Sequence, residues 1–189
     1  MKKYNVVSVR LCLAGLMAAL LGAVAIDDQK CYAETAVAPA VRKAKLIAPS
    51  TGSLPSDVTR VDASLDESKE LGQVALKATF EKGGYFGDYN LKIKDWRPFT
   101  YLRFKTFNPD KKPQSLNITI KHAGTTGYPT RFEQNILLRP GVSQQEIPLT
   151  GLANNDGSAA DLSVVKMLTI SLPQGGLVYF GDFTLETGD

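Results

Sequence analysis

The chain has 189 residues, of which 43% are hydrophobic and 22% are charged, a composition that suits one globular domain with processing segments. The net charge is +3, and residues 34–189 keep 18 Lys/Arg against 17 Asp/Glu. That part of the chain has no basic run longer than Lys111-Lys112, which excludes the concentrated positive stripe that nucleic-acid binding requires.

The N-terminal segment is typical of a secretory signal peptide. "MKKYNVVSVR" is a positive n-region, and the apolar run from Leu11 to Ile26 is short for a membrane-spanning helix. Cleavage after Ala25 or after Ala33 satisfies the small-x-small rule. We favour Ala33, because that cut removes both cysteines, whereas the other leaves one unpaired thiol in an oxidising compartment.

The predicted domain organisation follows from this processing. We expect a signal peptide over 1–33, a flexible spacer over 34–54 and one domain over 55–189. Within the spacer, "VRKAKLI" is the one candidate for an ordered piece. The mature protein is expected to be exported, either periplasmic or extracellular, with no stable membrane insertion after processing. An uncleaved membrane anchor is the alternative.

After the spacer, apolar and polar residues alternate with a period of two, which predicts strands with one buried face. The predicted strands are 74–80, 88–96, 101–107, 115–122, 131–138, 142–149, 164–172 and 176–186. Segments rich in Gly, Pro and Asn separate them and predict turns. Eight or nine strands without a long helical pattern indicate an all-β, antiparallel β-sandwich. The residues expected in its core include Leu76, Leu91, Phe104, Ile118 and Ile120.

Residues 71–187 resemble the carbohydrate-binding-like jelly-roll modules of secreted bacterial proteins, the galactose-binding-like group. The motifs that carry the resemblance are Asp95-Trp96, Asn108-Pro109, Arg131-Phe132, the turn Leu138–Gly141, Asp161-Leu162 and Tyr179-Phe180, in this order. The resemblance implies jelly-roll topology and a non-catalytic module that binds a polysaccharide or glycan in the cell envelope or outside the cell. The alternative is a structural or protein-interaction module with the same fold.

In related modules, an acidic residue in the last strand helps to hold a structural Ca²⁺. In this chain that place is Gly181, and Asp182 follows it. We therefore expect no cofactor, with a structural Ca²⁺ site formed by Asp62, Asp182 and backbone carbonyls as the alternative.

Catalysis has little support in the sequence. His122 is the only histidine, and it follows the apolar face of a predicted strand, where a structural role is expected. One histidine without a retained cysteine cannot form a zinc site, and no GxxxxGK[ST] phosphate-binding loop is present. We predict that the protein is not an enzyme.

Sugar-binding sites combine aromatic platforms with polar side chains, and three residues fit this chemistry best: Trp96, Tyr128 and Arg131. Tyr128 lies in a Gly/Pro loop, and Arg131 can donate paired hydrogen bonds to vicinal hydroxyls. The alternatives are a Trp96 that is buried with its N–H bonded to the backbone, and an Arg131 that serves as a structural ion-pair partner. A third aromatic group, Tyr85, Phe86 and Tyr89, lies in a Gly-rich segment.

Overall fold

The computed structural model describes residues 42–89 and 91–188. The predicted signal peptide, both cleavage sites and residues 34–41 of the predicted spacer lie outside these residues. The elements are β1 (Lys43–Ile47), the 3-10 helix η1 (Pro49–Thr51), β2 (Asp57–Ser68), β3 (Gln73–Asp88), β4 (Tyr101–Asn108), β5 (Gln114–His122), β6 (Phe132–Leu138), β7 (Gly141–Pro148), β8 (Val165–Ser171), β9 (Gly176–Phe180) and β10 (Phe183–Glu186). In this part of the chain, no helix has the length and apolar character needed to cross a bilayer.

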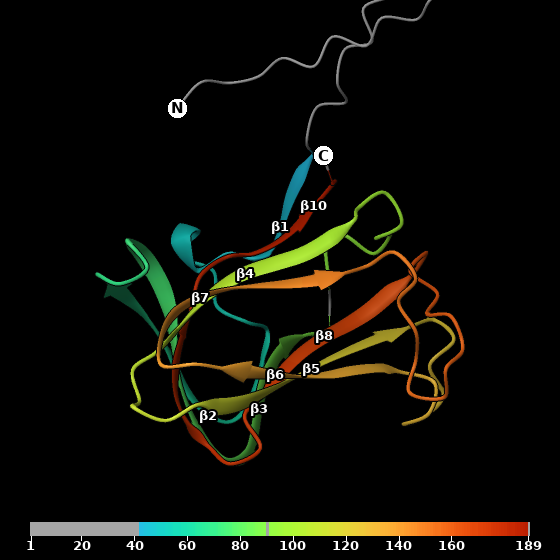
Figure 1. Cartoon of the computed structure of the whole chain (residues 1–189). Helices are drawn as coiled ribbons and strands as arrows, with labels where there is room; N and C mark the ends of the chain where they lie inside the picture. Colours follow the sequence, from blue (N-terminus) through green and yellow to red (C-terminus); the bar gives the residue numbers. More distant parts are fainter. Residues whose placement is uncertain (1–41, 90, 189) are drawn as a thin grey trace, which may run out of the picture. The chain divides into compact units, whose positions relative to one another are not determined.

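The strands form one continuous antiparallel sheet that folds back on itself into two layers (Figure 1). Its order is β1-β10-β4-β9-β3-β8-β5-β6, with β2 beside β3 and β7 beside β4. We call the layer β6-β5-β8-β3-β2 the front sheet and the layer with β7, β4, β9, β10 and β1 the back sheet. The predicted all-β, antiparallel sandwich is confirmed.

Strand β3 belongs to both layers and joins them. Its first part, Leu76–Phe80, pairs with β9 of the back sheet, and its last part, Tyr85–Asp88, pairs with β8 of the front sheet. The strand bends between these parts, where Gly83 has a positive φ of 74°. A side chain on Gly84 would place its Cβ 2.3 Å from the carbonyl oxygen of Arg60 on β2, so the paired strands β2 and β3 can approach this closely only at a glycine.

The core lies between the two layers, and the predicted core residues are confirmed. Leu76, Leu91, Phe104, Ile118 and Ile120 are each at most 2% exposed. An aromatic cluster contributed by both layers fills the centre, and its closest pair stacks with ring centroids 4.4 Å apart. The members of this cluster are Phe80, Phe86, Phe104, Phe180 and Phe183.

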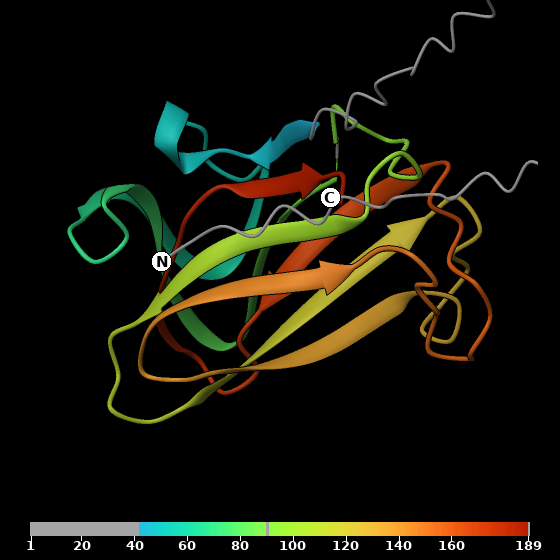
Figure 2. The ribbon, with the colours of Figure 1, turned by 45° about the horizontal axis from the view of Figure 1, so that its top comes forward.

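The sequence interpretation of residues 42–54 as flexible spacer is wrong. Residues 43–47 form β1, which pairs with β10 in the back sheet (Figure 2). Two ion pairs reinforce this pairing, from Lys43 to Glu186 at 3.0 Å and from Lys45 to Asp182 at 2.6 Å. The chain therefore enters the domain before Pro55, within the segment "VRKAKLI" that was the candidate ordered piece.

Two further strand predictions need correction. Of the strand predicted over residues 88–96, Asp88 ends β3, and residues 91–96 form a loop that buries Leu91 and Trp96 without joining a sheet. Conversely, β2 was not predicted. It is an edge strand whose inward residues Val61, Ala63 and Leu65 are only half-buried, so its hydrophobic pattern is weak.

Candidate functional site

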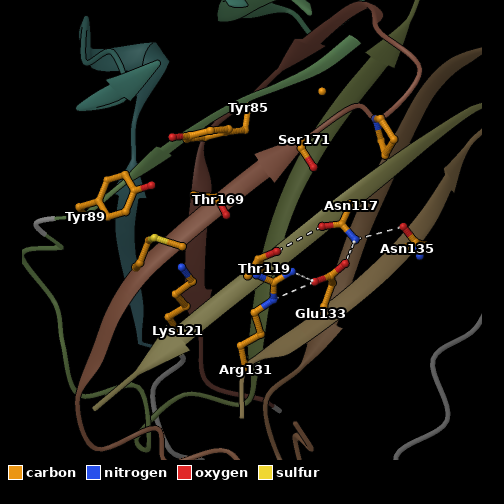
Figure 3. A pocket seen from close by; sticks show the side chains of 13 residues that line it. Tyr85, Tyr89, Asn117, Thr119, Lys121, Arg131, Glu133, Asn135, Thr169 and Ser171 are labelled. Atoms are coloured by element: carbon orange, nitrogen blue, oxygen red, sulfur yellow. Dashed lines mark hydrogen bonds and ion pairs between the residues drawn. The ribbon is translucent and has the colours of Figure 1, made fainter. Parts of the chain in front are cut away.

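The outer face of the front sheet forms a groove of about 530 Å³. It faces away from the core because residues in a strand alternate between the two faces of the sheet. Its lining residues are Gly83, Tyr85 and Tyr89; Asn117, Thr119 and Lys121; Arg131, Glu133 and Asn135; and Met167, Thr169, Ser171 and Pro173 (Figure 3).

Strand register brings these side chains into rows across the sheet. Asn117 of β5 lies opposite Asn135 of β6 on one side and Ser171 of β8 on the other. The next row has Thr119 of β5 between Glu133 and Thr169. Each row thus presents a short series of polar side chains from adjacent strands, which are about 4.8 Å apart.

The floor of the groove is held by a hydrogen-bond network around Glu133 (Figure 3). Its Oε1 accepts a hydrogen bond from Asn117 Nδ2 at 2.9 Å, and its Oε2 accepts one from Arg131 Nε at 2.9 Å. Asn117 also donates to Asn135 Oδ1 at 3.2 Å, and Thr119 donates to Asn117 Oδ1 at 3.2 Å. The floor is therefore preorganised, because each of these side chains orients the next.

Tyr85 and Tyr89 bound the groove on the β3 side, and Tyr89 is 50% exposed. Partial burial, together with hydrogen bonds to Tyr85 and Asp57, raises the pKa of the Tyr89 phenol above its usual value. This hydroxyl therefore stays protonated at neutral pH. The exposed ring is an aromatic surface on which the apolar face of a ring-shaped ligand can stack.

Gly87 of β3 lies between Tyr85 and Tyr89 in the sequence and opposite Thr169 of β8. A Cβ atom at this position would lie 2.3 Å from the carbonyl oxygen of Leu168 and 2.6 Å from the Thr169 methyl carbon. The close packing of β3 against β8 therefore requires glycine here.

The structure brings two of the three sequence-predicted site residues together. The guanidinium of Arg131 lines the groove and lies over the ring of Tyr128, 4.7 Å from the ring centre. Tyr128 is 60% exposed, and its loop is held by a 3.0 Å hydrogen bond from Asn155 Nδ2 to the Tyr128 carbonyl. Arg131 is also the ion-pair partner of Glu133, so it has the structural role that was considered as its alternative.

Trp96 is placed differently from the prediction of an exposed stacking surface. Its side chain is fully buried, and its Nε1 donates a 2.9 Å hydrogen bond to the carbonyl of Ile93. The flanking polar residues Asp95 and Arg97 pair with each other at 2.8 Å. The alternative interpretation, a buried residue whose N–H is bonded to the backbone, is the one that the structure bears out.

His122 is a structural residue at the end of β5, and it is 3% exposed. The backbone N–H of Gly124 donates to its Nδ1 at 3.2 Å, which makes Nδ1 an acceptor and leaves the proton on Nε2. Nε2 in turn donates to Asn154 Oδ1 at 3.1 Å. Both ring nitrogens are engaged, and they hold the loops after β5 and before β8 together.

The carboxylate of Asp182 accepts hydrogen bonds from the backbone N–H of Ser50 at 2.9 Å and from Lys45. Asp62 lies on β2, opposite Thr79 of β3. Within residues 42–89 and 91–188, no three His, Cys, Asp or Glu side chains gather in a way that could hold a metal ion.

Most of the groove residues were missed by the sequence interpretation. Asn117, Thr119 and Lys121 alternate with core residues along β5, and polar residues in this pattern are typical of the ordinary solvent-exposed face of a strand. The aromatic group of Tyr85, Phe86 and Tyr89 was identified in the sequence. Its two tyrosines line the groove, whereas Phe86 is fully buried in the core.

No family model matches this sequence, and no curated protein matches it significantly. Solved structures do match. The family 11 carbohydrate-binding module from Clostridium thermocellum, in complex with a β-1,3-1,4-mixed-linked tetrasaccharide, has 15% identity, a TM-score of 0.58, and coverage of 76% of this chain and 94% of that one. The family 11 module of a cellulosomal cellulase from the same organism has 16% identity, a TM-score of 0.57, and coverage of 77% and 94%.

An agarase matches with 16% identity and a TM-score of 0.60, over 77% of this chain but only 26% of the agarase. At these identities the likeness concerns the fold. The chain has the jelly-roll β-sandwich fold found in carbohydrate-binding modules.

Proposed function

We propose that this protein is an exported, non-catalytic carbohydrate-binding module whose ligand occupies the groove of the front sheet. One observation carries the proposal: a preorganised polar floor contributed by β5, β6 and β8 lies beside a half-exposed tyrosine ring. Sugars have apolar ring faces and hydroxyl rims, and such a groove offers a partner for each. The likeness to a module solved with a bound tetrasaccharide supports the same function.

The roles of individual residues follow from their chemistry. The Tyr89 ring provides the stacking surface, and Asn135, Thr169 and Ser171 provide hydrogen bonds to hydroxyls. Arg131 and Tyr128 extend the site at the end of the groove. Sites of this kind bind weakly, so we expect Kd values between millimolar and micromolar, about −4 to −8 kcal/mol.

Export is part of the proposal, and it is supported by the N-terminal charge and hydropathy pattern. The module then meets glycans in the envelope or outside the cell. N-terminal sequencing of the exported form tests this step, with Glu34 as the expected first residue. A protein that retains Met1 in a membrane fraction would contradict the cleavage.

The binding proposal is tested with a glycan array probed with the exported form, with and without Ca²⁺. We expect binding to at least one polysaccharide class and little effect of Ca²⁺, because the groove carboxylate of Glu133 is already paired with Arg131. Tyr89→Ala should abolish most of the signal. Val142→Ala is the matched control, since Val142 is 52% exposed but lies on β7 of the back sheet.

The alternative function, a structural or protein-interaction module, rests on one feature of the back sheet. Val142, Phe107 and Tyr179 form an apolar row across β7, β4 and β9, and the two rings lie 5.7 Å apart. An empty glycan array, combined with loss of envelope association in a Val142→Glu variant, would favour this function.

A further inference from the structure

The charges that line the groove do not cancel. They belong to three side chains, namely Lys121, Arg131 and Glu133. Arg131 and Glu133 form an ion pair and neutralise each other. Lys121 is half-buried, and in the described part of the chain it makes no ion pair and no side-chain hydrogen bond. The groove therefore carries one uncompensated positive charge.

The groove also has more free hydrogen-bond donors than free acceptors. Both oxygens of Glu133 already accept hydrogen bonds, from Asn117 and from Arg131. The ammonium of Lys121 has three N–H donors and no acceptor, and the amide of Asn135 keeps its donors because its oxygen is taken by Asn117. What remains is a surface rich in donors, which favours a ligand rich in acceptors.

The position of Lys121 concentrates this effect. It lies opposite Met167 of β8, and the antiparallel register that pairs Ile120 with Phe132 places Arg131 beside it. Figure 3 shows the two basic side chains next to each other on the floor of the groove. An anion that docks there can contact both cations.

The carboxylate of Asp57, on the opposite side of the groove, does not offset Lys121. Asp57 lies on β2, three strands away from β5, which corresponds to about 14 Å across the sheet. This is beyond the Debye length of about 8 Å at physiological ionic strength.

We infer that the groove selects an anionic glycan, with a carboxylate or sulfate group of the polysaccharide docked on Lys121 beside Arg131. The inference rests on the proposed function and adds the ligand class. In such a complex the ammonium donates charge-assisted hydrogen bonds to the anion, the Tyr89 side holds a neutral sugar face, and the chain of sugars runs across the strands.

The test compares neutral and acidic oligosaccharides that share a backbone. One pair is cellohexaose and its C6-oxidised, carboxylate-bearing counterpart, and the other is a desulfated carrageenan oligosaccharide and its sulfated parent. These pairs distinguish a carboxylate from a sulfate. Binding is measured by titration calorimetry for the wild type, Lys121→Gln and Lys105→Gln. Lys105 is the matched control, because it is an exposed lysine on β4 of the back sheet.

We expect the acidic member of at least one pair to bind about tenfold more tightly, the scale of one charge-assisted hydrogen bond. This preference should fall as salt is added. Lys121→Gln should bring the ratio close to one, and Lys105→Gln should leave the ratio unchanged.

Three results would overturn the inference. If the neutral members bind as well as the acidic ones, the proposed function stands and the ligand class is wrong. If the acidic preference survives in Lys121→Gln, the charge is recognised elsewhere. If no member of either pair binds and the glycan array is also empty, the proposed function and the inference fail together.

Discussion

The guanidinium of Arg131 lies over the face of the Tyr128 ring, 4.7 Å from its centre, and the same group donates to the carboxylate of Glu133. One cation thus joins an exposed loop to the floor of the groove. The loop after β5 is thereby fixed relative to the strand β6. The position of the Arg131 guanidinium in the groove in turn depends on both of its partners, Tyr128 and Glu133.

Replacing Tyr128 with Ala should weaken glycan binding a few-fold and leave the melting temperature nearly unchanged. The ring is 60% exposed, so its removal costs little packing, but the loss of an exposed cation–π contact of about 0.5–1 kcal/mol frees Arg131. Calorimetric titration with the best glycan of the array measures the effect. Tyr128→Phe keeps the ring and should bind like the wild type. Equal affinities for all three proteins would exclude the ring from the site.

Trp96→Ala should destabilise the domain by about 3–5 kcal/mol, because the indole is fully buried and its N–H is bonded to a backbone carbonyl. Urea denaturation followed by tyrosine fluorescence or circular dichroism measures the loss. The control is Arg97→Ala, which breaks only an exposed ion pair and should leave the stability nearly unchanged. A loss below 1 kcal/mol in Trp96→Ala would contradict the burial described above.

Gly87→Ala should lower both stability and glycan binding. The added methyl group has no room against Leu168 and Thr169, so β3 and β8 must separate, at a cost of about 1–3 kcal/mol. Gly127→Ala is the matched control, since its Cβ would meet only an ordinary contact of 3.7 Å with Pro129. Chemical denaturation and titration of the two variants give the comparison. If both variants behave like the wild type, the packing of β3 against β8 does not require glycine at position 87.

Acid should weaken the attachment of β1. Burial disfavours the charged form of Asp182 and of Glu186, but hydrogen bonds from Lys45 and Ser50 in one case, and from Lys43 and Arg103 in the other, outweigh it and lower both pKa values. Carboxyl groups whose folded-state pKa is lowered contribute stability above their unfolded pKa of about 4, and this contribution disappears as the pH falls through the folded value.

Hydrogen exchange of the β1 amides between pH 6 and pH 3 measures this effect, after correction for the intrinsic pH dependence of exchange. Protection should be constant above about pH 5 and decrease below about pH 4. In Asp182→Asn, part of this decrease should already be present at neutral pH. Protection that does not change with pH in the wild type would show that the two ion pairs do not hold the strand.

Much of the fold could be predicted because the alternation of apolar and polar residues along a strand indicates directly which side chains are buried. Phe104, Ile118 and Ile120 were assigned to the core correctly, since each has polar neighbours on both sides in the sequence. The same signal misled at residues 91–96, where a loop buries alternate residues without joining a sheet. It was absent from β2, an edge strand whose inner face is only partly covered.

The candidate site was harder to predict, because it depends on which strands become neighbours. Asn117 and Asn135 lie 18 positions apart, and they meet only through the register of β5 and β6. Trp96 has the composition of a sugar contact, yet the loop turns it inward. The proximity of Tyr128 and Arg131 could be predicted, because they are close in sequence and lie in one loop between β5 and β6.

The pairing of β1 with β10 has a mechanical consequence. Lys43 at the start of β1 lies opposite Glu186 at the end of β10, so the described chain enters and leaves the domain at the same rung of one ladder. A force applied between these two points opens the ladder like a zipper, loading one rung at a time, because the hydrogen bonds run perpendicular to antiparallel strands. Among the described strands β1 pairs only with β10, and the groove lies on other strands. Under tension applied at Lys43 and Glu186, β1 should therefore separate from β10 while the strands that form the groove stay paired.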